Sequence, residues 1–197
     1  MRMLKTCCRV VLSAGLMTAA GCSKDSGSGE MQPGASQGNE APPATGTVPM
    51  NKLSDGQILS IVGRVDTAEI DQAQVALDKT NDPDIRTFAT HMVDEHTAAK
   101  QAGAQLATQA SLTRAPSPKA LELESKATQT LAMLKAADSA SFDPTYVRAQ
   151  VDQHAEVLKL IDDQLLPAVM APALRDYLTN ARAMVQRHLE QARQLQK

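Results

Sequence analysis

The chain has 197 residues, enough for one domain with extensions, and 43% of them are hydrophobic, which suffices for a core. Aromatic residues make up only 2% and Trp is missing, so Ala and Leu must fill that core, which favours helices over a β-sandwich. The 20 basic and 22 acidic residues leave a net charge of -2, which gives no electrostatic reason to expect a nucleic-acid partner. No apolar run approaches the roughly 20 residues that span a bilayer.

Residues 1–21 have the pattern of an export signal. A basic start (residues 2–9) precedes a short apolar stretch (residues 10–20), and small residues stand directly before Cys22. This arrangement resembles a bacterial lipoprotein signal peptide, which implies cleavage before Cys22 and acylation of its thiol and amine. The alternative is an ordinary secretory cleavage near Ala20.

The residue after Cys22 bears on location. Ser23 stands where an Asp would favour retention in the inner membrane, so the pattern favours an outer-membrane lipoprotein that faces the periplasm. Its only predicted contact with the membrane is the lipid anchor. The other cysteines, Cys7 and Cys8, fall inside the signal, which leaves none for a disulfide or a Cys-based zinc site in the folded part.

Residues 22–52 comprise the lipidated cysteine and a segment rich in Gly, Ser, Pro, Gln and Asn. Too few apolar residues occur there to offset the entropy of ordering the chain, which predicts a disordered linker. Such a linker spans roughly 30 Å on average. The alternative is an ordered docking arm.

Residues 53–197 are predicted to form an all-α, ferritin-like up-down four-helix bundle with a helical crossover. Proline and capping residues mark the helix starts. Short connections pair the first two and the last two helices as antiparallel hairpins, and a shorter third helix crosses between them. The expected helices run from Ser54 or Asp55 to about Thr80, from Asp82-Pro83 to about Ala110, from Ser117-Pro118 to near Ser139, from Asp143-Pro144 to about Val169, and from Ala171-Pro172 to about Gln196.

The apolar stripe of each long helix contains one ionisable residue. These residues are Glu69, His96, His154 and His188. At 1.5 Å per residue, all four lie roughly 13–20 Å below the same end of the bundle. One shared layer is therefore expected.

Three interpretations of this layer remain open, one of which is that the inner faces of the helices are misassigned and the four residues do not meet. Three imidazoles and one carboxylate suit a mononuclear transition-metal site for Zn, Cu or Fe. The same four groups also suit a buried, hydrogen-bonded polar cluster without a metal, since burying each separately would be costly.

Neighbouring residues carry weaker signals. His91 is expected to be solvated, and Asp94 and Glu95 are expected to be surface charges, although either suits a role in orienting His96. Met92 and Met184 lie one turn before histidines, but core packing explains them better than copper binding does.

The domain resembles the bacterial family called domain of unknown function 4142, exported proteins with a ferritin-like helical bundle. The segments that carry the resemblance are residues 67–70, 88–97, 142–146 and 150–154, with His188-Leu189 near the end. The resemblance covers about residues 53–196 and implies the fold and an envelope location, with no established activity.

Ferritin-like di-iron proteins carry two Glu-x-x-His motifs. Here the residues three before His96, His154 and His188 are all valines. The di-iron ligand set is not present, which argues against ferroxidase or iron-storage activity.

The sequence contains no complete catalytic motif and favours a non-enzymatic protein. The leading prediction is a membrane-anchored periplasmic bundle that binds a partner or supports the envelope under stress, and the protein partner is unknown. A bundle with a purely structural polar network ranks beside it. The alternative is a metal-binding carrier or redox protein with Glu69, His96, His154 and His188 as its ligands.

Overall fold

The computed structural model describes residues 52–196, so the predicted signal peptide, the lipidation of Cys22 and the linker up to residue 51 lie outside the described residues. Within that range the chain is all-α and contains no strand. The elements are α1 (Asp55–Lys79), α2 (Pro83–Gln109), α3 (Pro118–Ala136), α4 (Phe142–Leu160), the π-helical segment η1 (Ile161–Leu165), α5 (Leu166–Ala168) and α6 (Pro172–Gln194).

The first three helices begin where the sequence predicts. The Ser54 side chain accepts the backbone N–H of Gln57 while the Gln57 side chain accepts that of Ser54, which is a complete capping box. Asp82 and Ser117 cap α2 and α3, each with proline as the first helical residue.

The start of α4 differs from the prediction that Asp143 caps it. The helix begins at Phe142, and the Ser141 side chain forms no cap. The Asp138 carboxylate instead accepts the backbone N–H groups of Ala140 and Ser141 in the preceding turn. Helix α3 ends at Ala136, before this turn and three residues before the predicted end.

The backbone N–H groups at the start of α6 donate to a side chain of another helix. Ala171 has no side chain that could cap α6. The Asp55 carboxylate, in the first turn of α1, accepts the N–H groups of Met170 and Ala171 at 2.9 Å each. This contact fixes the two helix ends to each other.

The predicted fourth helix contains a wider turn before it ends at Ala168. Pro167 has no N–H to donate and its ring would clash with the carbonyl of Asp163 in a regular α-helix. The chain avoids this clash by forming the wider turn of η1, where the Leu166 N–H donates to the carbonyl of Ile161, five residues back.

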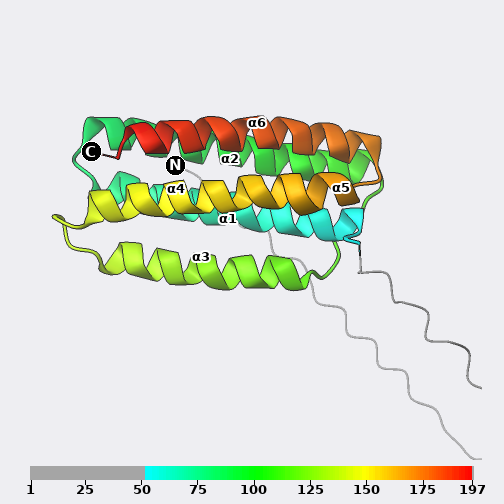
Figure 1. The fold of residues 1–197 in the computed structure, drawn as a ribbon, viewed down its shortest axis with the longest axis horizontal. Coiled ribbons are helices and arrows are strands. Elements are labelled where there is room, and N and C mark those ends of the chain that lie inside the picture. Colours follow the sequence, from blue (N-terminus) through cyan, green and yellow to red (C-terminus); the bar gives the residue numbers. More distant parts are fainter. Residues whose placement is uncertain (1–51, 197) are drawn as a thin grey trace, which may run out of the picture. The chain divides into compact units, whose positions relative to one another are not determined.

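The long helices form the predicted bundle of two hairpins with a crossover (Figure 1). The first hairpin is α1 with α2, and the second is α4 with α6. Helix α3 connects them and packs mainly against α1, with a smaller contact to α4. No helix in residues 52–196 has the length and hydrophobicity to cross a membrane.

The bundle core consists of two apolar clusters. One contains Ile58 and Val62 of α1 with Leu174 and Leu178 of α6. The other contains Ala73 of α1 with residues near the opposite end, such as Phe88, Met92, Phe142, Tyr146 and Ala192. Between the two clusters every long bundle helix changes from apolar to polar residues on its inner face. That polar layer holds the candidate site.

Candidate metal centre

The polar layer gathers buried ionisable and amide side chains from α1, α2, α4 and α6. Each is at most 5% exposed. Burying such groups is costly unless they are paired, hydrogen-bonded or bound to a metal. They are Asp66, Glu69 and Gln72 of α1, His96 of α2, Gln150 and His154 of α4, and His188 of α6.

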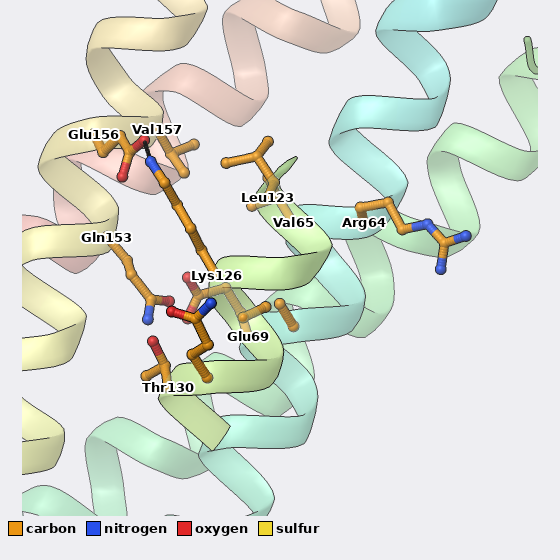
Figure 2. A pocket seen from close by; sticks show the side chains of 12 residues that line it. Arg64, Val65, Glu69, Leu123, Lys126, Thr130, Gln153, Glu156 and Val157 are labelled. Carbon is orange, nitrogen blue, oxygen red and sulfur yellow. Dashed lines mark hydrogen bonds and ion pairs between the residues drawn. The ribbon is translucent and has the colours of Figure 1, made fainter. Parts of the chain in front are cut away.

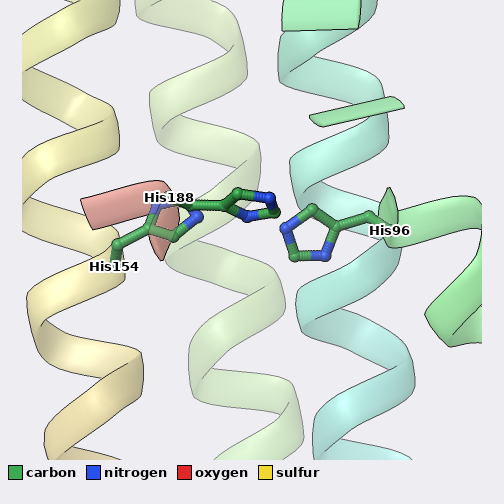
Figure 3. A group of neighbouring side chains, drawn as sticks. All are labelled: His96, His154 and His188. Atoms are coloured by element: carbon green, nitrogen blue, oxygen red, sulfur yellow. The ribbon is translucent and has the colours of Figure 1, made fainter. Parts of the chain in front are cut away.

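Three histidine rings from three helices face one another in this layer (Figure 3). One ligand nitrogen from each of His96, His154 and His188 lies within 4.8 Å of the other two. The ring centroids are separated by 5.2 Å for His96–His188, 5.5 Å for His154–His188 and 6.1 Å for His96–His154. The rings therefore surround a single point.

His96 is held by a carboxylate on the neighbouring helix. Its Nδ1 lies 3.0 Å from Oδ1 of Asp66. A carboxylate oxygen accepts this hydrogen bond, so Nδ1 is the donor and Nε2 is the ring nitrogen that faces away from Asp66. Within residues 52–196 that buried Nε2 has no hydrogen-bond partner. A carboxylate behind a histidine is the usual arrangement for a metal ligand, because it fixes the tautomer and the ring orientation.

His154 shows the same division of roles. Its Nδ1 donates to the backbone carbonyl of Gln150, one turn earlier in α4, at 2.9 Å. Its Nε2 is buried and, among the described residues, has no partner. The Gln150 side chain in turn donates to Gln72, which donates to Gln153. This amide chain supports the α4 turn that carries His154.

His188 is less constrained. Neither ring nitrogen makes a hydrogen bond within the part of the chain that the structure describes. Nε2 lies 3.3 Å from Oε2 of Glu95, but the angle does not suit a hydrogen bond. Glu95 is 41% exposed and also contacts Arg187 at 2.9 Å, so it lies at the edge of the layer. This leaves Nδ1 as the His188 nitrogen without a neighbouring carboxylate.

The surroundings keep two of the imidazoles neutral. Burial lowers the pKa of His188 to about 3, and the neighbouring rings of His96 and His154 act in the same direction. Burial also lowers the pKa of His154, partly opposed by the negative charge of Glu69. Neutral imidazole is the form that binds a metal.

Glu69 is buried in the same layer but outside the histidine group. It is 2% exposed, and its Oε2 has no hydrogen-bond partner among residues 52–196. Its oxygens are not part of the set of ligand atoms that lie within 4.8 Å of one another. Its negative charge raises the pKa of His154, against the larger effect of burial. Burial raises the pKa of Tyr146, and the charge of Glu69 raises it further. Glu69 also lines a pocket between α1, α3 and α4 (Figure 2).

A comparison with protein families covers most of the chain. The family model described as "Domain of unknown function (DUF4142)" matches residues 39–195. The chain belongs to the DUF4142 family. No curated protein and no solved structure matches it. The match includes every residue of the polar layer but attaches no activity to it, so the function must be argued from the site itself.

The structure brings three of the four predicted site residues of this DUF4142 domain together. His96, His154 and His188 converge, while Glu69 lies beside them, and its role as a ligand stays a prediction. His91 is exposed as expected, and Met92 is a fully buried core residue.

The partner of His96 was not predicted. Asp94 and Glu95, its neighbours in sequence, do not hold the ring, and Asp66 does so from α1. One signal in the sequence points to Asp66. It lies three residues before Glu69 and so on the same inward face of α1.

Proposed function

We propose that this DUF4142 protein binds one transition-metal ion through His96, His154 and His188, in a domain anchored to the membrane on the periplasmic side. The convergence of unpartnered histidine nitrogens at the centre of the bundle carries this proposal. Buried polar atoms almost always have partners. A bound ion would satisfy one nitrogen of each ring at once.

The spacing of the nitrogens suits a metal after a small contraction. Three atoms within 4.8 Å of one another lie at most about 2.8 Å from a common centre, against about 2.0–2.1 Å for a zinc–imidazole bond. Rotation of the side chains can supply this difference.

The charges of the layer support a divalent cation. Asp66 and Glu69 are buried carboxylates, and two of the three imidazoles are held neutral. A dication among neutral rings would balance the two negative charges. Imidazole with nearby carboxylate is compatible with Zn, Cu or Fe, so we propose one ion of this group.

The metal-free alternative explains less of the geometry. A polar cluster would satisfy its members by pairing them with one another. Here Asp66 pairs with His96 and the glutamines pair together. The inward nitrogens of the three rings find no partner within residues 52–196, and neither does one side-chain oxygen each of Asp66, Glu69 and Gln150.

The cellular setting rests on the sequence. The signal-like residues 1–21, Cys22 and Ser23 support export, acylation and an outer-membrane lipoprotein facing the periplasm. A Cys22→Ser variant should leave the membrane fraction and appear in the soluble periplasmic fraction. Retention of that variant in the membrane would contradict the anchor.

Elemental analysis tests the metal site. The purified full chain, exported by cells grown with mixed metals, should carry close to one transition-metal ion. The His96→Ala, His188→Ala double variant should carry none, and His91→Ala, which removes an exposed histidine, should keep the ion. A metal-free parent, or equal metal in the double variant, would overturn the proposal, provided that circular dichroism shows the variants folded.

A further inference from the structure

A pocket of about 240 Å³ lies between α1, α3 and α4. Figure 2 shows the apolar side chains of Val65, Leu123 and Val157 beside it. Lys126 of α3 reaches across to Glu156 of α4, at 2.5 Å. The pocket is therefore mainly apolar, with one ion pair along its wall.

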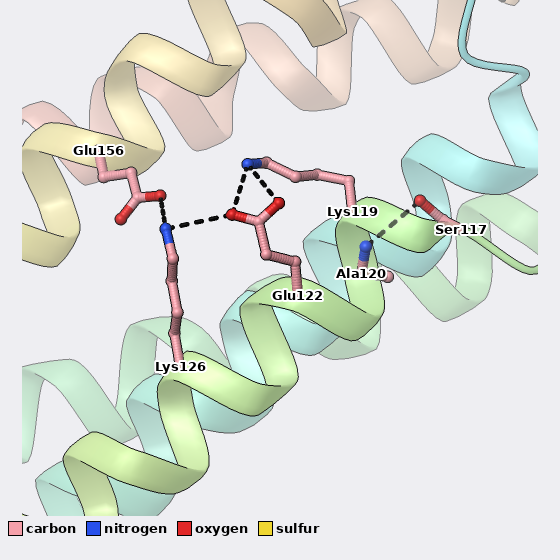
Figure 4. A network of polar contacts seen from close by, with 6 residues as sticks. All are labelled: Ser117, Lys119, Ala120, Glu122, Lys126 and Glu156. Atoms are coloured by element: carbon pink, nitrogen blue, oxygen red, sulfur yellow. Dashed lines mark hydrogen bonds and ion pairs between the residues drawn. The ribbon is translucent and has the colours of Figure 1, made fainter.

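The same lysine belongs to a short polar network on α3 (Figure 4). Glu122 contacts both Lys126, at 3.2 Å, and Lys119, at 3.1 Å. These exposed pairs contribute little stability individually. They hold Lys126 in the position where it connects α3 to α4 beside the pocket.

Glu69 forms the buried wall of this pocket. Its side chain is 2% exposed, and Oε2 lacks a hydrogen-bond partner within the described part of the chain. Gln153 and Val157, which also line the pocket, flank His154 in α4. The pocket thus ends against the helical turn that carries one of the three proposed ligands.

Three histidine ligands would leave one position of a four-coordinate ion open. Catalytic and exchangeable zinc sites commonly have three protein ligands with water in the fourth place. Glu69 is too distant to join the 4.8 Å group. A carboxylate beyond bonding distance of the ion can still accept a hydrogen bond from a water bound to it.

We infer that the pocket between α1, α3 and α4 admits a small ligand to a fourth coordination position on the ion, with Glu69 accepting the hydrogen bond of the water that normally occupies it. This inference rests on the proposed metal site. The ligand class is a small molecule or anion of a few atoms, because the pocket has a volume of about 240 Å³ and two cationic side chains, Arg64 and Lys126, line it. A ligand without a proton, such as azide, would replace the water and lose the Glu69 contact.

Cobalt(II) and azide test the inference on the full chain. Cobalt gives visible absorption that reports its ligands, so azide binding can be followed by stopped-flow absorbance. Ala127→Phe places a ring in the pocket, and Ala132→Phe places the same ring on an exposed site of α3 that does not line it. The azide association rate should fall about tenfold or more in Ala127→Phe and stay unchanged in Ala132→Phe.

A second variant, which widens the pocket, tests the same route if Ala127→Phe does not fold. Leu123→Ala removes a partly buried wall side chain and should speed azide entry. Cobalt binding with no response to azide would overturn the open position. Equal azide rates in the folded pocket variants and the parent would overturn the route. A parent that binds no cobalt would overturn the metal site itself, which separates the two failures.

Discussion

Two carboxylates of α1 set the charge of the histidine layer. Asp66 hydrogen-bonds His96, and Glu69 acts on His154 through its charge. Neither lies on α2, α4 or α6, which carry the histidines. At the scale of single residues, α1 therefore supplies the two buried carboxylates and the other three helices supply the nitrogens, with the half-exposed Glu95 of α2 at the edge of the layer.

Asp66→Asn should weaken metal binding without unfolding the domain. The asparagine amide keeps the shape of the Asp66 side chain but not the charge that fixes the His96 tautomer. Loss of such a partner typically lowers metal affinity 10- to 100-fold. Isothermal titration with zinc measures this. Asp71→Asn, an exposed change on the same helix, should leave the affinity unchanged. An unaltered affinity in Asp66→Asn would contradict the role of Asp66.

The metal-free protein should lose stability in mild acid. Burial lowers the pKa of His188 to about 3 and also lowers that of His154, whereas unfolded histidine titrates near about 6.5. Below about pH 6.5 the unfolded chain therefore binds more protons, so the free energy of unfolding falls as pH falls. His188 alone should contribute a loss on the order of 2 kcal/mol between pH 7 and pH 5.

Urea unfolding at pH 7, 6 and 5 measures that loss. His188→Gln should reduce the pH dependence, because one of the two histidines with a lowered pKa is removed while His154 remains. His91→Gln should retain it, since His91 is exposed. A pH dependence that is the same in His188→Gln and the parent would show that His188 does not titrate as described.

At the scale of elements, one contact connects two distant helix ends. Asp55 accepts two N–H groups at the start of α6, which has no cap of its own. Asp55→Ala should lower the free energy of unfolding by about 1.5–3 kcal/mol, the range for hydrogen bonds to a charged group. Asp71→Ala, exposed on the same helix, should change it by less than about 0.5 kcal/mol. Equal effects of the two substitutions would contradict the capping role.

The helices were predictable from the sequence because their signals are local. Cap residues followed by proline marked α2 and α3, and apolar periodicity marked the faces. The contact of Asp55 with the start of α6 escaped prediction because those N–H groups belong to a distant helix. The turn formed by Asp138 escaped prediction because no proline or cap pattern marks it. The wider turn of η1 depends on Pro167, which the periodic pattern alone does not reveal.

The candidate site was predictable in part for the same reason. Three histidines interrupt three apolar stripes, and helix lengths place them at one height. The pairing of Asp66 with His96 depends on how α1 rotates against α2, which the spacing of residues does not determine. The same rotation places Glu69 beside the pocket and outside the histidine group.

At the scale of the whole molecule, an ion would join helices of both hairpins. His96 belongs to the first hairpin, and His154 and His188 belong to the second. Zinc at 100 times its dissociation constant should raise the free energy of unfolding by about 2.7 kcal/mol. The His96→Ala, His188→Ala variant should show no rise. Equal stabilisation of the variant would place the zinc elsewhere.

The most direct test of the metal centre is a crystal structure of the zinc-loaded protein with an anomalous difference map at the zinc edge. We expect one strong peak in the polar layer, about 2.0–2.1 Å from one nitrogen of each of His96, His154 and His188. A map with no peak between these rings, or with peaks only at surface residues, would contradict it.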